Sequence, residues 1–282
     1  MDNRIALYKY ARIVISPTRM NQKNLVFLLF VALISISAYS QKSSNFIVGF
    51  EVGSNFVFGE LNQAWNVRQD VGSYDYEYGS MYSGTGTEMT MSYIGIKPEL
   101  SFFNNKLGIS SGLRYTRMNS ALNNKSSFFY LRDNVNASNT DYFKVKKINE
   151  DNDYLGIPLE VTYVPFQNEN LDIYFRVGAE LNFRFNTQLD IRFLNADMNP
   201  YQQEIIRHTG ITTNSVYSSV YTAVGIRFGN RNDVKYNLEL ILPSFIVSNN
   251  NSSVIIPKYY TGFKFSVQIP LHKTGIVKTE KL

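Results

Sequence analysis

The chain of 282 residues contains no cysteine. Disulfide bonds and cysteine-based metal sites are therefore excluded. A bacterial lipoprotein carries its lipid on a cysteine directly after the apolar part of its signal sequence, so that form of membrane anchoring is excluded too. Long apolar runs are also missing. After Phe46 no stretch approaches the roughly 20 residues that a membrane-spanning helix needs.

One apolar run near the N-terminus has the layout of a secretory signal peptide. Lys23 supplies a basic region, residues 25–36 an apolar region, and a small-x-small cleavage site ends at Ser40. The apolar region is short for a spanning anchor, which favours cleavage over membrane retention. We therefore expect residues 20–40 to be a cleaved signal peptide. We expect residues 1–19 to be a dispensable or non-native extension from a misassigned start.

Charge is sparse in this chain, whereas aromatic side chains are abundant. Charged residues make up 18% of the chain and the net charge is +5, part of it in the removable N-terminus. No basic stretch resembles a phosphate-binding groove, so we expect no nucleic-acid partner. Aromatic residues make up 15% of the chain, and membrane β-barrels need many of them for the girdles at their two interfaces.

The segment Thr261–Leu271 alternates without error between apolar and other residues. Its apolar positions are Phe263, Phe265, Val267, Ile269 and Leu271. The positions between them are Gly262, Lys264, Ser266, Gln268 and Pro270. Because successive side chains of a strand point to opposite faces, this pattern predicts a strand with one apolar face.

Seven further segments show the same alternation. They cover approximately residues 45–58, 90–102, 107–118, 153–164, 171–182, 216–228 and 234–245. Each has about 12 residues, which at a rise of roughly 3.3 Å and a tilt of about 45° spans one hydrocarbon core. Mid-strand charges all fall on the face opposite the aromatic and aliphatic residues. We therefore predict an all-β fold, an eight-stranded antiparallel up-and-down transmembrane β-barrel over residues 41–271, followed by a periplasmic tail at 272–282.

The connections between these segments alternate in length. The short ones are residues 103–106, 165–170 and 229–233. The long ones are residues 59–89, 119–152, 183–215 and 246–258. Outer-membrane barrels have short periplasmic turns and long extracellular loops, so both termini are expected in the periplasm. The alternative, a soluble β-sandwich, would carry more Lys and Glu on its solvent face than the Gly and Ser found here.

Four prolines fall inside the predicted strands: Pro98, Pro158, Pro243 and Pro270. Proline cannot donate to the hydrogen-bond ladder, and a closed barrel has no edge strand to accommodate it. We expect a β-bulge or a strand boundary at each of them. The sequence leaves open whether a fifth hairpin extends over residues 183–193.

The predicted inward faces carry eleven charged residues, five acidic and six basic. They are Glu51, Lys97, Glu99, Arg114, Glu160, Arg176, Glu180, Arg227, Lys235, Glu239 and Lys264. Buried charges must be paired, so we expect a salt-bridge network across the lumen. An eight-stranded barrel is just filled by its side chains, which favours a rigid plug over an ion path.

Candidates for chemistry are few. His208 lies in a long loop with Ser215 and Ser218 nearby, the residue types of a lipid-modifying barrel enzyme, but no motif fixes their geometry. A surface histidine is the alternative that we favour. Asp151-Asn152-Asp153 lacks the further ligands of a calcium loop and is interpreted as a solvated strand entry. We therefore expect no catalytic residue, no cofactor and no metal site.

Two loop features are candidates for binding. The first long loop contains Tyr74, Tyr76, Tyr78 and Tyr82 among Gly, Ser and Thr. Tyrosine with small polar residues is the composition of adaptable binding surfaces, although an interfacial girdle looks similar. The second long loop is basic at Lys144, Lys146 and Lys147, where we favour a solvated run of charge over the alternative, contact with lipopolysaccharide phosphate.

The segment Tyr154–Tyr163, with the sequence YLGIPLEVTY, resembles the corresponding strand of the PorT-like outer-membrane β-barrel family of the Bacteroidetes lineage. The Gly-rich strand 108–115 and the closing segment 262–267 are similar to that family in style. The resemblance spans nearly all of residues 41–271 and implies architecture more than activity. The family includes a component needed for type IX protein secretion and gliding, and it implies no catalytic residues here.

Together these observations lead us to expect an integral outer-membrane protein, exported through a cleaved signal peptide. We expect a non-enzymatic binding or scaffold role through extracellular loops, with a role accessory to type IX protein secretion as its specific form. The alternatives are a lipid-modifying enzyme of the outer leaflet and a narrow ion channel through the charged lumen. The partners would be membrane lipid and lipopolysaccharide, and other outer-membrane or secretion proteins.

Overall fold

The computed structural model describes residues 45–65, 67–68, 85–124, 128–132, 142–211, 213–229, 233–247 and 251–271. The expected extension, signal peptide and C-terminal tail, with the four loop tyrosines, lie outside the described residues. The barrel strands are β1 (Asn45–Leu61), β3 (Thr85–Phe102), β4 (Leu107–Ser111), β5 (Leu113–Asn124), β7 (Tyr142–Gln167), β8 (Leu171–Phe193), β9 (Val216–Phe228), β10 (Lys235–Ile246) and β11 (Ile255–Pro270). The remaining elements are η1 (Gln63–Trp65), β2 (Val67–Arg68), β6 (Phe129–Arg132), η2 (Ala196–Tyr201) and α2 (Gln202–His208).

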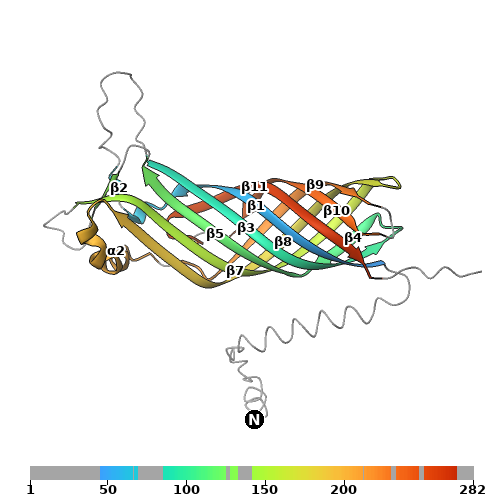
Figure 1. The fold of residues 1–282 in the computed structure, drawn as a ribbon, viewed down its shortest axis with the longest axis horizontal. Coiled ribbons are helices and arrows are strands. Elements are labelled where there is room, and N and C mark those ends of the chain that lie inside the picture. Colours follow the sequence, from blue (N-terminus) through green and yellow to red (C-terminus); the bar gives the residue numbers. More distant parts are fainter. Residues whose placement is uncertain are drawn as a thin grey trace, which may run out of the picture. The chain divides into compact units, whose positions relative to one another are not determined.

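The barrel strands form a closed antiparallel ring. Each strand pairs with its neighbours in the chain, and β1 also pairs with β11 along nearly its whole length. Since β4 and β5 follow each other along the same two neighbours, β3 and β7, they act as one wall strand. The predicted eight-stranded up-and-down barrel is confirmed. Figure 1 shows the short turns at one end and β2 and α2 at the other.

The strand register also gives the stagger that closes the ring. Starting from Val52 on β1, the pairings through β3, β5 and β7 reach β8 at Phe183. The pairings through β11, β10 and β9 reach β8 at Ile173, which lies ten residues earlier in the same strand. This offset tilts the strands against the barrel axis, as closure of a twisted sheet requires.

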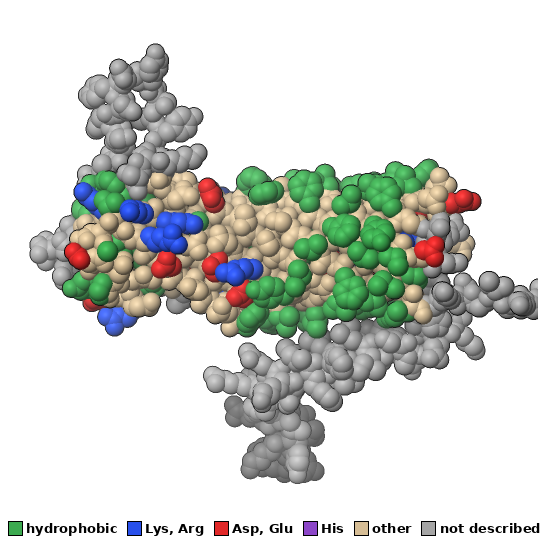
Figure 2. Space-filling model, viewed as in Figure 1, with side chains coloured by type: hydrophobic (Ala, Val, Ile, Leu, Met, Phe, Trp, Pro, Cys, Tyr) green, Lys and Arg blue, Asp and Glu red, His purple; other side chains and the backbone are tan. Residues whose placement is uncertain are grey.

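The outer face of the barrel is apolar over the part nearer the short turns. Outward side chains there include Phe50, Ile94 and Phe263, which are half exposed or more. Figure 2 shows this apolar band, with Lys, Arg, Asp and Glu gathered beyond it toward the end with α2. A soluble protein rarely exposes so large an apolar surface, whereas a membrane barrel requires one. The structure is therefore that of a transmembrane barrel.

Pro98 and Pro158 flank a break in the strand that lies between them. They lie on β3 and β7, the two neighbours of Gly112, which separates β4 from β5. The ladders on both sides of Gly112 stop before it and resume after it, because the facing prolines have no N–H to donate. The expected irregularity is thus in the neighbouring strand, and the register of Pro98 with β1 and of Pro158 with β8 is unbroken.

The other two prolines behave as expected. Pro243 lies in a register shift of β10 against both β9 and β11, which is a bulge. Pro270 is the last residue of β11, where a missing donor interrupts nothing further.

Several strands are longer than the sequence pattern predicted. β7 has 26 residues and β8 has 23, so much of the predicted loop 119–152 is strand and so is 183–193. No separate fifth hairpin forms at 183–193, since this segment pairs with β7 as a continuation of β8. The predicted strands ended where the outward side chains cease to be apolar. That point is the membrane boundary and not the end of the strand. Among the described residues, no helix has the length and hydropathy of a membrane-spanning helix.

We predict that Gly112→Ala destabilises the barrel by about 1–3 kcal/mol, the usual cost of overpacking. A Cβ atom at Gly112 would lie 2.1 Å from the backbone oxygen of Ile96, so the strands must separate. Urea unfolding in detergent, followed by circular dichroism, measures the effect.

Gly86→Ala is the matched control, because a Cβ there meets only the side-chain oxygen of Asn123, at 3.2 Å. Equal unfolding midpoints for the two variants would contradict the prediction.

Candidate functional site

All eleven charged residues predicted to face inward are buried in the lumen, each at most 7% exposed. The structure adds one that the sequence reading missed, Asp172 on β8, which lies 3.8 Å from the ammonium group of Lys235. Within the described residues, the membrane part of the lumen thus holds six acidic and six basic side chains, and Glu150, which the sequence analysis also missed, is a further buried acid above them at the mouth. Equal numbers of opposite charges allow every buried charge to be paired, as the low-dielectric interior demands.

Glu160 on β7 lies at the centre of this network, and its side chain is fully buried. Its carboxylate forms ion pairs with four cations from four different strands: Lys97, Arg114, Arg176 and Lys264. It also accepts hydrogen bonds from Ser110 Oγ, at 3.2 Å, and from Tyr221 OH. One carboxylate therefore joins β3, β4, β5, β8, β9 and β11 to β7.

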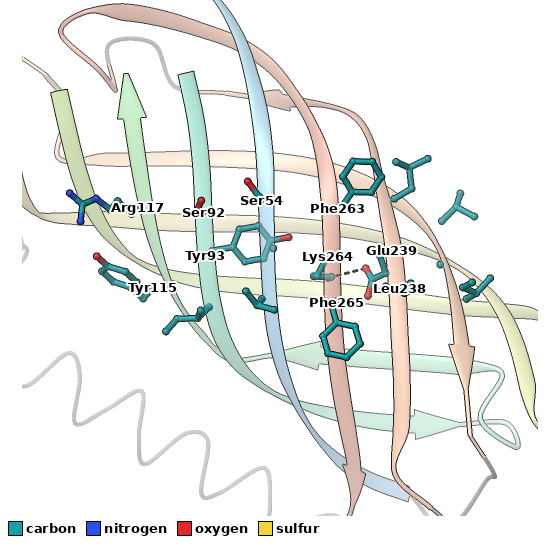
Figure 3. Close-up of a pocket in the computed structure, with 17 residues that line it drawn as sticks. Ser54, Ser92, Tyr93, Tyr115, Arg117, Leu238, Glu239, Phe263, Lys264 and Phe265 are labelled. Carbon is teal, nitrogen blue, oxygen red and sulfur yellow. Dashed lines mark ion pairs between the residues drawn. The ribbon is translucent and has the colours of Figure 1, made fainter. Parts of the chain in front are cut away.

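The other lumen charges extend the network along the barrel. Toward the short turns, Arg227 lies 3.5 Å from Glu99. Glu99 also accepts a hydrogen bond from Gln268 at 2.9 Å. Near the centre, Lys264 pairs with Glu239 at 2.9 Å, an ion pair drawn in Figure 3. Charges are therefore paired through the depth of the lumen and not at one point only.

Tyrosine rings fill the space that the charges leave. The guanidinium carbon of Arg114 lies 4.5 Å from the ring centre of Tyr93, and Tyr174 is contacted by both Arg176 and Arg227. Such cation–π contacts stabilise desolvated cations further. A hollow above the network, lined by Asn55, Thr116 and Tyr217 among others, has a volume of about 10 Å³, room for roughly one water.

A second closure lies beyond the membrane, at the extracellular mouth. The segment Asn251–Val254 is buried there, although it belongs to a predicted loop. Its backbone is held from below, because Glu150 accepts hydrogen bonds from Ser252 Oγ and from the Ser253 amide at 2.7 Å. Tyr154 OH also donates to the Asn251 oxygen at 2.9 Å.

An apolar core lies around this segment, and we call the structure built on it the extracellular head. Trp65 of η1 is 1% exposed and donates its indole N–H to the Ser253 oxygen at 2.8 Å. Its neighbours in the core come from the upper strands and from α2: Leu122, Phe129, Leu131, Val145, Ile148, Ile191, Phe193, Ile205 and Ile255. Here the inward face is apolar and the outward face polar, the reverse of the membrane part.

The outer face also has a shallow groove of about 930 Å³, lined at its rim by Ser54, Ser92, Phe263 and Phe265 (Figure 3). Its walls are outward side chains of the apolar band, and it is open rather than enclosed. We interpret it as the surface against which lipid acyl chains pack, because the apolar band faces hydrocarbon.

The residues that the sequence analysis considered for catalysis, His208, Ser215 and Ser218, lie apart from the charge network of the lumen. His208 lies on α2 in the head, beside Trp65 and Ile205, with Glu204 3.9 Å from its Nε2. Ser215 and Ser218 lie at the start of β9. Within the described residues, no group of three or more His, Asp or Glu side chains could hold a metal ion.

The interpretation of Asp151-Asn152-Asp153 as a strand entry is wrong, because all three lie within β7. Asp151 and Asp153 point outward. Asp151 accepts a hydrogen bond from the Arg117 guanidinium at 3.0 Å, and Asp153 accepts one from the Tyr115 hydroxyl at 2.7 Å. Asn152 points inward and is buried. These outward polar contacts form a ledge at the upper limit of the apolar band.

Comparison with known proteins adds little detail. A scan against protein-family models and a search of curated proteins found no match. The outer membrane protein OprG from Pseudomonas aeruginosa is 11% identical over 81% of this chain and 97% of that chain, with a TM-score of 0.42. Neisserial surface protein A is 9% identical over 81% of this chain and 99% of that chain, with a TM-score of 0.41.

Ail of Yersinia pestis, solved in complex with the heparin analogue sucrose octasulfate, is 10% identical over 80% of this chain and 99% of that chain. Its TM-score is 0.31. The assignment of the fold depends on the strand register of this chain itself, which closes an eight-stranded transmembrane barrel of the outer-membrane type.

We predict that Glu160→Leu destabilises the barrel by about 3–5 kcal/mol, because it leaves four buried cations short of an anion. Glu160→Gln keeps the shape and removes only the charge, so it serves if the leucine variant does not fold. Urea unfolding in detergent is the measurement.

Arg117→Gln is the control, since it breaks an exposed ion pair with Asp151 and should change the free energy of unfolding by less than about 1 kcal/mol. If the Glu160 variants lose no more free energy of unfolding than Arg117→Gln does, the network does not hold the barrel together.

We also predict that the wild-type protein gives no discrete current steps in planar lipid bilayers, because the lumen is closed at the charge network and again at the mouth. Insertion is verified by the shifted gel mobility of the folded barrel. Steps that change in size when Arg114 or Glu160 is neutralised would contradict a closed lumen.

Proposed function

We propose that this chain is an integral outer-membrane protein that acts without catalysis, as a binding or scaffold protein working through its extracellular head. The observation that carries the proposal is the pairing of a doubly closed lumen with a packed structure outside the membrane. A barrel that transports nothing through its centre still serves to hold that structure at the cell surface.

The head supports this proposal because it is more than a set of loops. Its core contains a buried tryptophan, and the segment Asn251–Val254 is fixed to β7 through Glu150. A rigid element presents binding residues with less loss of conformational entropy than a mobile loop does. We therefore place the binding surface on the outside of the head.

The alternatives receive less support. An ion channel needs a continuous path, and both levels of the lumen are filled. For a lipid-modifying enzyme, His208 would have to act near the outer leaflet, whereas it lies on α2 and lines a small pocket of the head together with Trp65 and Ile205. The non-enzymatic proposal agrees with that placement.

We further propose a PorT-like identity, with a role accessory to type IX protein secretion and with lipopolysaccharide and other envelope proteins as partners. The support is the resemblance of Tyr154–Tyr163. This segment of β7 supplies Tyr154 to the mouth, Pro158 to the strand break and Glu160 to the centre of the lumen. The resembling residues are therefore those that build the barrel.

The test is capture from native outer membranes in mild detergent, with mass spectrometry of the proteins that co-purify. We expect partners with the wild-type protein and their loss with Trp65→Ala, because truncation of this buried side chain loosens the head by about 3–5 kcal/mol. Phe103→Ala is the control, since Phe103 is a 76% exposed aromatic in a short turn at the opposite end of the barrel.

Secretion or gliding proteins among the captured partners would support the specific form of the proposal. A barrel recovered alone from every preparation would argue against a scaffold role.

A further inference from the structure

The sheet formed by β6, β7 and the end of β8 has two different faces. Its inner face packs into the head core through Phe129, Val145 and Phe193, all at most 6% exposed. Its outer face carries the residues between these, which are basic and aromatic, and a register shift between Val145 and Lys147 leaves both Lys146 and Lys147 outside the core. We call this surface the basic face: Phe128, Tyr130, Tyr142, Lys144, Lys146, Lys147 and Arg192.

The cations of the basic face lie close to one another. Lys147 is directly opposite Arg192 in the register, and Lys144 and Lys146 are exposed a few residues further along β7. Asp190, 3.6 Å from Arg192, is the carboxylate that partly offsets them. The three lysines form no ion pair with any carboxylate of the described chain. Among the described residues, the face therefore lacks the anions that balance the charges in the lumen, and its neighbouring like charges repel one another.

Aromatic rings are interleaved with these cations. The ammonium nitrogen of Lys144 lies 5.1 Å from the ring centre of Phe128 and 5.9 Å from that of Tyr130. Tyr130 and Tyr142 meet edge to face at 6.4 Å, and Tyr142 is 42% exposed. Exposed tyrosine offers an apolar ring with a polar edge, which suits contact with a sugar.

The height of the basic face selects among anions. Asp153 belongs to the polar ledge that ends the apolar band, and Lys147 lies six residues above it on β7. At about 3.3 Å per residue and a tilt of about 40°, this is roughly 15 Å. A headgroup layer is only about 5–7 Å thick on each side. Phospholipid headgroups therefore lie below the basic face. The basic face itself lies at the level of the saccharide that covers an outer leaflet.

We propose that the basic face binds an anionic saccharide, with the lysines pairing its phosphate, sulfate or carboxylate groups and the exposed tyrosine ring contacting its sugar. This inference rests on the proposed function, because it assigns a ligand to the head. The same chemistry is offered by the lipopolysaccharide core of the cell's own membrane and by a free acidic polysaccharide.

The test measures binding of purified full-length protein in detergent to immobilised dextran sulfate, with neutral dextran as the blank. Lys144→Gln with Lys146→Gln should weaken binding roughly tenfold, since each exposed charge contact contributes up to about 1 kcal/mol. Lys106→Gln with Lys258→Gln removes the same charge elsewhere and should change affinity less than about twofold.

A second comparison distinguishes recognition of the sugar ring from recognition of negative charge alone. Tyr142→Leu keeps every cation, so it should weaken binding of dextran sulfate and leave binding of inorganic polyphosphate, which has no sugar ring, unchanged. Equal losses for the two probes would overturn the saccharide assignment.

The source of the ligand is then tested by measuring binding to native lipopolysaccharide. Binding that falls after its phosphates are removed by phosphatase supports the cell's own membrane as the source. Binding of dextran sulfate without binding of lipopolysaccharide supports a free polysaccharide.

Absence of binding to both probes, or equal losses in the two lysine variants, overturns the inference. The proposed function would survive that result if proteins still co-purify with the wild-type barrel, whereas conductance in bilayers would overturn it regardless of saccharide binding.

Discussion

The ion pairs around Glu160 are the constraint on which the rest of the barrel depends. A buried carboxylate is tolerated only when cations and hydrogen-bond donors surround it, and here four cations from four strands do so. Each of those strands must therefore keep its register, since a slip by a single residue would turn its charge out into the lipid. The network fixes the register from inside, as the apolar band does from outside.

Along the axis the barrel reverses its polarity. In the membrane part the strands are apolar outside and charged inside, because hydrocarbon surrounds them. Above the ledge at Asp153 the same strands are apolar inside and polar outside, because water surrounds them there. β7 crosses this boundary without interruption, with Glu160 inward below it and Ile148 inward above it. A strand can change its solvent without changing its hydrogen bonding, which is why the barrel and the head form one continuous sheet.

The period-two alternation in the sequence was enough to predict the barrel, its eight strands and the inward placement of eleven of the twelve charges in the membrane part of the lumen. Their pairing was not predictable, because it depends on the stagger between strands that lie far apart in the sequence. Glu150 was missed because the predicted strand began at Asp153, where outward residues become polar. The separation of β4 from β5 was missed because its cause, two prolines, lies on the neighbouring strands. The loop tyrosines lie outside the described residues, and their role remains a prediction.

The lumen network also bears on how such a barrel closes. Glu51 belongs to the first strand and Lys264 to the last, and they lie 3.5 Å apart across the seam where β1 meets β11. Before the seam forms, each of these charges lacks a partner from the opposite end of the chain. Joining the ends therefore adds this ion pair at the same moment as it completes the hydrogen-bond ladder. The seam that joins the two ends of the chain is therefore held by opposite charges inside the lumen as well as by backbone hydrogen bonds.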